Sequence, residues 1–234
     1  MTSRPVALLA GIGDGLGTSL AATFAGAGYD IAGLSRSGRT TATVGPAVRA
    51  AGGSYTPLTA DLGVESEVSE VLRPLASRVE VMVHTAHRLT IKPFVETPPA
   101  EFEAVWRAGF LGAVIATHAI LPAMLAHGRG TIVLAGATAS VRAGARFAAF
   151  ASAKFALRGL AQSLAREHGP AGIHVVHLLL DGLIDEPQSD ARFGIGEGGR
   201  MDPDAIASAC LTLVRQPPST WTQELDLRPS TEKF

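Results

Sequence analysis

Short apolar runs alternate with longer segments of helical period along almost the whole 234-residue chain. The helical patterns cover residues 16–27, 41–51, 65–77, 101–127, 149–168 and 203–215. The apolar runs cover residues 5–10, 29–35, 54–59, 79–84, 130–136, 173–180 and 222–227, and the first six are nearly continuous in apolar residues. Such runs are typical of parallel strands covered on both faces, and strict alternation with helices implies right-handed crossovers. The sequence therefore predicts one doubly wound α/β domain over residues 1–234, with a mainly parallel seven-stranded sheet flanked by helices.

Composition narrows the class of protein. The formal net charge is −1 and no cluster of Lys and Arg stands out, so we expect no nucleic-acid partner. The single cysteine, Cys210, excludes an intrachain disulfide and is expected to be a buried thiol. The apolar run at the amino terminus is too short for a signal peptide, and no other stretch suggests a membrane span. We expect a soluble, cytoplasmic protein without a membrane partner.

A glycine-rich turn follows the first apolar run directly. Gly11, Gly15 and Gly17 lie between that strand and a helical pattern, and Gly13 adds a fourth glycine. Glycines let the backbone turn sharply and approach a pyrophosphate, while a helix amino terminus offers free N–H groups to the anion. Strand, glycines and helix in this order predict a dinucleotide site.

The end of the second apolar run indicates which dinucleotide binds. An NAD site usually has a carboxylate at this point, whereas an arginine accommodates the 2′-phosphate of NADP. Ser35 and Arg36 occupy the junction and Arg39 is close by, which favours NADP over NAD. Asp14, inside the glycine turn, counts against a nearby phosphate because like charges repel.

A polar, glycine-rich stretch at 187–199 is longer than an ordinary connection. Long connections of this kind often cover a site, so we expect a substrate-loop insertion at about residues 186–200.

The motifs together resemble the short-chain dehydrogenase/reductase family, which has a single Rossmann-type domain. The glycine turn matches the family's amino-terminal motif, Asp61-Leu62 resembles its adenine-contacting pair, and Ala86 and Lys154 match residues of two further motifs. The stretch from Asp181 resembles the family's Pro-Gly segment, with Glu186 in place of a threonine. The resemblance implies that the cofactor is held by Gly11, Ile12, Gly15, Leu16, Gly17, Asp61, Leu62, Ala86, Lys154 and Ile184, and the junction after the second run adds Ser35 and Arg36.

The same resemblance implies a catalytic set of Asn, Ser, Tyr and Lys, of which only Lys154 is present. Gly109, Ala137 and Phe150 stand where the family has asparagine, serine and tyrosine. General acid catalysis contributes about 10²–10⁴ in rate, and a phenyl ring cannot supply it. Hydride transfer by the family's usual mechanism should therefore be crippled, while Lys154 is still able to hold the nicotinamide ribose.

Three groups are candidates to replace the missing acid. Thr138 directly follows Ala137, and a small change of register would aim its hydroxyl at the substrate. His84 and His87 flank the carboxyl end of the fourth run, where an imidazole is able to donate a proton near neutral pH; the alternative is that they only hydrogen-bond backbone. Asp181 and Asp185 are carboxylates that an apolar cleft would protonate, although Asp185 also suits a turn cap. Water is the remaining donor.

The sequence leaves three functions open. The leading one is an atypical NADP(H)-dependent oxidoreductase acting on a small carbonyl or alcohol substrate, with Lys154, Thr138 and His87 as catalytic candidates. The others are a catalytically silent NADP(H)-binding sensor or scaffold, and non-redox chemistry in the same cleft. His174 and His177 are three apart in a strand and so on opposite faces, and no metal site is predicted. Small residues along 147–167 predict close helix packing, which in the resembled family forms a homodimer or homotetramer.

Overall fold

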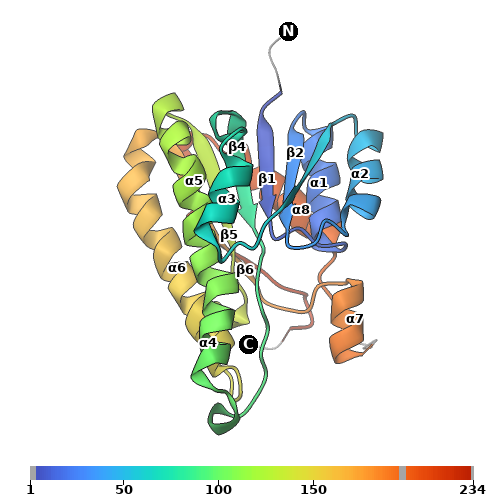
Figure 1. Ribbon diagram of the computed structural model, residues 1–234, viewed down its shortest axis with the longest axis vertical. Coiled ribbons are helices and arrows are strands. Elements are labelled where there is room, and N and C mark those ends of the chain that lie inside the picture. Colours follow the sequence, from blue (N-terminus) through green and yellow to red (C-terminus); the bar gives the residue numbers. More distant parts are fainter. Residues whose placement is uncertain (1–3, 195–198, 233–234) are drawn as a thin grey trace.

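The computed structural model describes residues 4–194 and 199–232. Within these residues, seven strands form one sheet in the order β3-β2-β1-β4-β5-β6-β7, and every pairing between neighbours is parallel (Figure 1). This confirms the predicted doubly wound α/β fold. The strands are β1 (Val6–Ala10), β2 (Asp30–Ser35), β3 (Tyr55–Thr59), β4 (Val79–His84), β5 (Gly130–Ala135), β6 (Ile173–Leu180) and β7 (Glu224–Leu227).

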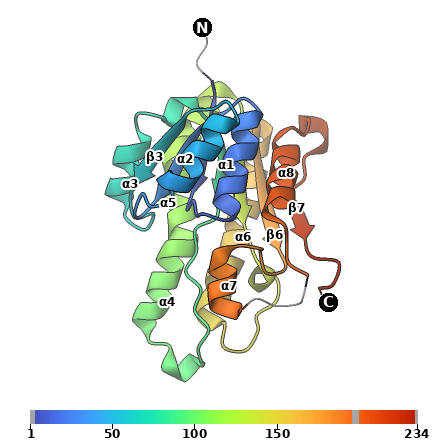
Figure 2. The same ribbon diagram turned by 90° about the vertical axis from the view of Figure 1, so that its right-hand side faces the viewer.

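Helices cover both faces of the sheet. On one face lie α1 (Leu16–Gly26), α2 (Thr41–Ala50) and α8 (Pro203–Val214), and on the other α3 (Glu65–Leu72), α5 (Gly112–His127) and α6 (Ala148–His168) (Figures 1 and 2). Each layer buries its own cluster of apolar side chains against the sheet. All five residues of β1 are buried, because this strand is covered on both faces.

The helical pattern at 101–127 is interrupted in the structure. Helix α4 (Pro99–Trp106) passes through a π-helical turn, Arg107–Leu111, into α5 without a break in the chain direction. The whole segment Pro99–His127 is long and apolar enough to cross a membrane by length and composition, contrary to the expectation from the sequence. Core helices of soluble proteins meet the same criterion, and the Ile120 and Met124 side chains are fully buried against the sheet.

Two further expectations were wrong in detail. Strand β3 lies at the edge of the sheet, and Leu58 is its only buried residue, so it is not covered on both faces. The predicted loop at 187–199 begins with helix α7 (Pro187–Phe193), which starts with a proline in its first turn. Residues 195–198 of that loop lie outside the described residues.

The strand order fixes the position of the site. Strands β1 and β4 are neighbours, although two strands and three α-helices separate them in sequence, and Ala10 pairs with His84 at their carboxyl ends. The direction of strand succession reverses here, and ligands of open α/β sheets bind at such a point.

Candidate functional site

The glycine turn brings the ends of β1 and β4 together. Gly11 has a φ of +92°, and a Cβ atom there would overlap the backbone of Ala86. The Ala86 N–H donates to Ala10 O at 3.3 Å, and the Thr85 hydroxyl donates to Gly11 O at 3.1 Å. The structure therefore places the predicted cofactor residues Gly11 and Ala86 in contact at the switch point of the sheet.

The remaining turn residues open the first turn of α1. Gly17 lets the turn fold closely, because a Cβ there would lie 2.7 Å from Ile12 Cγ1. Ile12 itself is buried and its N–H donates to Leu34 O at 3.1 Å, so this N–H is not available to a ligand. Ile12 therefore shapes the turn through packing.

An anion already lies at this helix terminus. The N–H of Leu16 donates to the Glu186 carboxylate, Oε2, at 3.2 Å. Gly15 makes room for that carboxylate, since a side chain at residue 15 would overlap Glu186. The contact shows that the turn accepts a negatively charged group, as a dinucleotide pyrophosphate requires. The turn residues thus fit this cofactor.

The predicted adenosine end is built from the loops after β2 and β3. Arg36 is exposed directly after β2, and the Arg39 Nε donates to Ser37 Oγ at 3.2 Å. The side chain of Asp14 is fixed by a hydrogen bond, in which its Oδ1 accepts from Thr43 Oγ1 at 2.6 Å. Arginines and a carboxylate thus remain close to the place where a ribose would lie.

Asp61 and Leu62 stabilise the turn between β3 and α3 and its packing against α5. The Asp61 Oδ1 accepts from the Gly63 N–H at 2.8 Å and so fixes the turn before α3. Leu62 is buried, and a Cβ on Gly112 would lie 2.9 Å from its Cβ. The Asp61 backbone is engaged as well, because its N–H donates to Glu67 Oε2 at 2.8 Å and its carbonyl oxygen accepts from the Val64 N–H at 2.9 Å.

Lys154 lies under the predicted nicotinamide end. Its Nζ donates to Ala135 O at 2.7 Å and lies 5.7 Å from the centre of the Phe150 ring. Burial lowers the pKa of Lys154 to about 8, because the charged amine is removed from water. Lysine and aromatic ring therefore share one face of α6, as their spacing predicts.

The three residues that replace the family's asparagine, serine and tyrosine have no polar side-chain atom. Phe150 is 8% exposed and packs with Ala139 and Ala151, next to Leu89 and Ala137. Gly109 lies in the π-helical turn, and a Cβ there would meet only Ala153, at 3.8 Å. Packing around this turn therefore leaves space for a larger residue than glycine.

Thr138 is engaged by a carboxylate. Its hydroxyl donates to Asp181 Oδ1 in a short hydrogen bond, and Asp181 Oδ2 lies 3.2 Å from Arg228 Nη1. A threonine hydroxyl has a single proton, which is used in this contact. In this arrangement Thr138 is an acceptor toward a substrate and not the acid that its position suggested. Asp181 is likewise held in an ion pair with Arg228.

His87 lies beside the phenyl ring that replaces tyrosine. The two ring centroids are 6.0 Å apart at an interplanar angle of 68°. The His87 Nδ1 lies 3.1 Å from the carbonyl oxygen of Thr85. A carbonyl oxygen can only accept, so Nδ1 carries the proton and Nε2 carries the lone pair of the neutral ring.

The surrounding protein keeps both histidines of this segment neutral. Burial and the Lys154 charge lower the pKa of His87 to about 4, although its side chain is still exposed to solvent. Burial lowers the pKa of His84 to about 3, and neither of its ring nitrogens has a partner among the described residues. The expectation of an imidazole that donates near neutral pH is therefore replaced by one that accepts.

The segment after β6 completes the site. Ile184, predicted to contact the nicotinamide, forms an isolated parallel bridge with Met201, and the Asp185 N–H donates to Met201 O at 2.9 Å. Helix α7 follows and lies beside the glycine turn through Glu186. Sequence reasoning noted Glu186 only as a departure from a motif, because a contact across 170 residues leaves no local pattern.

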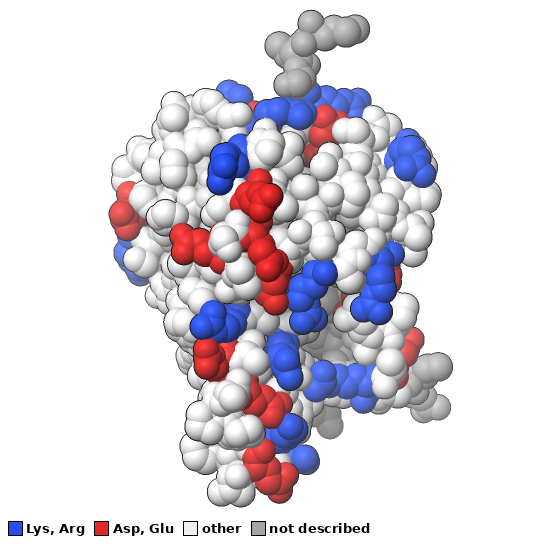
Figure 3. Space-filling view, in the orientation of Figure 1, with Lys and Arg blue, Asp and Glu red and all other residues white. Residues whose placement is uncertain are grey.

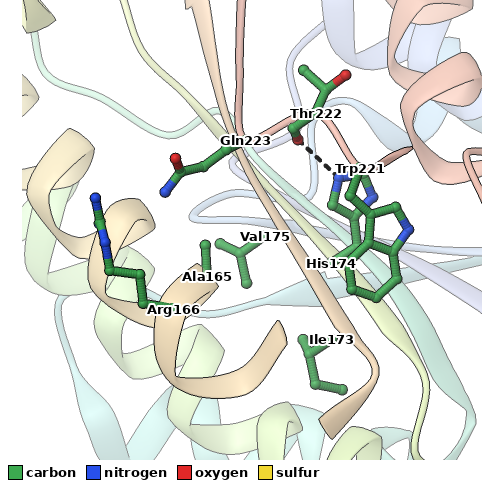
Figure 4. Close-up of a pocket in the computed structure, with 8 residues that line it drawn as sticks. All are labelled: Ala165, Arg166, Ile173, His174, Val175, Trp221, Thr222 and Gln223. Atoms are coloured by element: carbon green, nitrogen blue, oxygen red, sulfur yellow. Dashed lines mark hydrogen bonds between the residues drawn. The ribbon is translucent and has the colours of Figure 1, made fainter. Parts of the chain in front are cut away.

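A separate pocket lies at the opposite end of the sheet. Its lining includes the amino end of β6, and Figure 4 shows His174 beside Trp221 within it. These rings stack with centroids 4.8 Å apart, and His174 Nε2 lies 2.9 Å from Thr222 O. The Nδ1 of His177, by contrast, lies within hydrogen-bond distance of Glu224 Oε2, at 2.9 Å. Among residues 4–194 and 199–232, no group of three His, Cys, Asp or Glu side chains is arranged to hold a metal ion.

Solved structures share this architecture. A short-chain dehydrogenase from Rhodopseudomonas palustris is 35% identical with a TM-score of 0.84, covering 97% of this chain and 100% of that one. An alcohol dehydrogenase from Thermococcus sibiricus, complexed with 5-hydroxy-NADP, is 24% identical with a TM-score of 0.85 and covers 99% of each chain. A metagenomic short-chain oxidoreductase in complex with NADP is 23% identical with a TM-score of 0.83 and covers 98% of each.

Sequence comparison gives the same result. A short-chain dehydrogenase/reductase of Armillaria gallica is 28% identical over 191 residues, which are 79% of this chain and 73% of the relative. An uncharacterized oxidoreductase of Staphylococcus saprophyticus is 23% identical over 229 residues, 96% of this chain and 97% of the relative. The family model described as short chain dehydrogenase matches residues 5–186. The chain belongs to the short-chain dehydrogenase/reductase family.

Proposed function

We propose that this protein is an NADP(H)-dependent oxidoreductase that interconverts a small alcohol and the corresponding carbonyl compound, with His87 in place of the family's tyrosine. The observation that carries the proposal is the contact between the His87 and Phe150 rings, 6.0 Å apart, beside Lys154. It puts a titratable nitrogen next to the position that a phenol would occupy. The arrangement favours oxidation of the alcohol.

The preference for oxidation follows from the protonation state of His87. With the proton on Nδ1, the Nε2 lone pair accepts the hydroxyl proton as the C–H hydride leaves the same carbon, giving a carbonyl product and a His87 imidazolium. In the opposite direction the ring must begin protonated. With a pKa of about 4, only about one ring in 10³ is protonated at pH 7.

Lys154 assists from below the ring. Its amine, held by Ala135 O at 2.7 Å, would donate to the ribose hydroxyls next to the nicotinamide. Bound NADP⁺ would supply the hydride acceptor. The Lys154 charge also disfavours the imidazolium of His87, so the proton taken up there is readily passed to water.

The charge distribution supports NADP over NAD. In Figure 3, Lys and Arg side chains gather around a hollow in the surface beside α7, although the whole chain has a net charge of −1. Arg36 and Arg39 follow β2, where the 2′-phosphate would lie. Two structural neighbours, the metagenomic oxidoreductase and the Thermococcus sibiricus enzyme, are described with NADP or an NADP derivative.

A second function, a catalytically silent NADP(H)-binding protein, is favoured by one observation. The only proton of Thr138 is given to Asp181, and Phe150 has no hydroxyl, so the site retains Lys154 but lacks a polarised donor. Such a protein would bind NADP(H) without transferring hydride.

Turnover with a panel of small alcohols and carbonyl compounds tests the proposal. We expect the purified protein to reduce NADP⁺ with at least one alcohol and to show a faster oxidation than reduction at pH 7. Bound NADPH detected by fluorescence without turnover of any panel member would leave the silent function as the better account. Absence of binding by NADP(H) and NAD(H) alike would remove both.

We further propose that the protein acts in the cytoplasm as a homodimer or homotetramer. Trp106 on α4 and Phe155 on α6 are 40% and 44% exposed. Exposed aromatic side chains on neighbouring helices suit a contact between copies of the chain. Light scattering coupled to size-exclusion chromatography should give a mass of two or four chains, and the double variant Trp106→Glu with Phe155→Glu should give one.

A further inference from the structure

The side chain of Glu186 lies across the glycine turn. Its Oε2 accepts from the Leu16 N–H at 3.2 Å, and the carboxylate fills the space that Gly15 leaves. Gln188, two residues after Glu186, also lies close to the turn. A Cβ built on Gly13 would lie 3.2 Å from the side-chain amide nitrogen of Gln188. The start of the segment 186–193, here named the strap, therefore covers the part of the turn where a pyrophosphate would bind.

The strap is an ordered element with contacts at both ends. The N–H groups of Ser189 and Asp190 donate to Glu186 O at 3.0 and 3.2 Å, which begins α7 immediately behind the carboxylate. At the other end, Arg192 Nη2 donates to the Leu89 carbonyl at 2.8 Å. Leu89 packs in the cluster that contains Phe150, so the strap joins the nucleotide turn to the segment after β4.

A carboxylate at this place competes with a pyrophosphate. Both are anions that accept from the Leu16 N–H at the start of α1, which has no hydrogen-bond partner within the helix. Two like charges at that distance also repel each other. A nucleotide that binds to the turn must therefore displace Glu186 or accept repulsion from it. A hydroxyl side chain at residue 186 would impose neither condition.

We propose that Glu186 is an internal mimic of the pyrophosphate and holds the nucleotide site shut, so that NADP(H) binds only when the strap moves off the glycine turn. The inference rests on the proposed NADP(H) binding. NADP(H) then binds only to molecules in which the turn is free. Its apparent affinity is therefore the intrinsic affinity multiplied by the fraction of such molecules. Because Arg192 ties the strap to Leu89, opening of the strap also releases the segment that carries His87.

The test compares NADPH binding by calorimetry in the native chain, Glu186→Gln and Glu186→Thr. With the turn covered in nine or more molecules out of ten, loss of the carboxylate should tighten binding by about tenfold or more. Inorganic pyrophosphate should show the same order of affinities, because it probes the turn alone. Glu70→Gln removes an exposed carboxylate on α3 and should leave both affinities within about twofold of the native values.

A second readout examines the strap without any ligand. Arg192 is an exposed trypsin site within the strap, and its cleavage should be several times faster in Glu186→Gln than in the native chain. Glu186→Thr serves if the glutamine variant does not fold, as judged by circular dichroism.

The outcomes separate this inference from the proposed function. Equal or weaker NADPH binding by both Glu186 variants, with clear binding by the native chain, overturns the inference and leaves the function intact. If neither the native chain nor any variant binds a dinucleotide, the proposed function fails and the inference fails with it. Tighter binding of NADPH and pyrophosphate with faster cleavage supports both.

Discussion

The imidazole of His87 lies at 68° to the phenyl ring of Phe150, with the ring centroids 6.0 Å apart. The phenyl ring stands where the family carries its acid, and the imidazole lies against that ring, as does the Lys154 amine at 5.7 Å from the ring centre. A proton acceptor has thus been provided by the segment after β4 and not by α6.

Removal of His87 should abolish most of the turnover. We expect His87→Ala to lower kcat by about 10²–10⁴, the usual contribution of general acid–base catalysis, while the Kd for NADPH changes little. Steady-state kinetics and a binding isotherm measure the two effects separately. Added imidazole should restore part of the rate in His87→Ala, which a merely structural role would not produce; an unchanged kcat would contradict the role of His87.

Return of the family's acid should bypass His87. The double variant Phe150→Tyr with Ala137→Ser places a phenol about one ring length from Lys154, which at present lies 5.7 Å from the Phe150 ring centre. We expect carbonyl reduction by this variant to rise by about 10²-fold or more and to persist when His87 is also alanine. Phe155→Tyr, an exposed ring on the same helix, should have no effect. If reduction appears only in the restored variant and the native chain shows none in either direction, the silent function is supported.

Arg36 should decide between the two dinucleotides. A hydrogen bond to a charged group is worth about 1.5–3 kcal/mol, so Arg36→Ala should weaken NADPH binding by roughly ten- to a hundredfold. NADH lacks the 2′-phosphate and should bind the variant as it binds the native chain. Titrations with both cofactors give the ratio, and Arg73→Ala, which removes an exposed charge at the end of α3, is the control. Equal losses for NADH and NADPH would contradict a 2′-phosphate contact.

The sheet could be predicted because its strands are short apolar runs between amphipathic helices. All seven strands begin within two residues of their expected positions, and β1 is apolar throughout because both of its faces are buried. Strand β3 shows the limit of this argument, since an edge strand needs no second buried face. Helix α7 escaped prediction because seven largely polar residues carry no apolar stripe.

The nucleotide turn was predictable and its occupant was not. Glycines at fixed spacing after a strand are a local signal, whereas the contact of Leu16 with Glu186 depends on how a distant connection folds back. The same holds for Thr138, whose hydroxyl is set by Asp181 on another strand end and by the ion pair with Arg228. Residue types suggested which groups were available for catalysis, while tertiary contacts determined which of them carry a free proton or lone pair.

His84 should make the fold sensitive to acid. Its ring is fully buried without a hydrogen-bond partner among the described residues, and burial lowers its pKa from an ordinary 6.5 to about 3. In the unfolded chain His84 takes up a proton below pH 6.5, whereas in the folded chain it stays neutral until about pH 3. Its contribution to stability is therefore fully present above pH 6.5 and is lost as the pH falls, at up to about 1.4 kcal/mol per pH unit.

Denaturant unfolding between pH 7 and 4.5 measures this slope. The variant His84→Asn removes the titrating ring, so its free energy of unfolding should fall less steeply with decreasing pH than that of the native chain. His118→Asn, the same substitution at an exposed position of α5, should keep the native slope. Parallel pH profiles for the native chain and His84→Asn would contradict this prediction. They would mean that His84 takes up a proton as readily in the folded chain as in the unfolded chain, and that the buried ring is not held neutral.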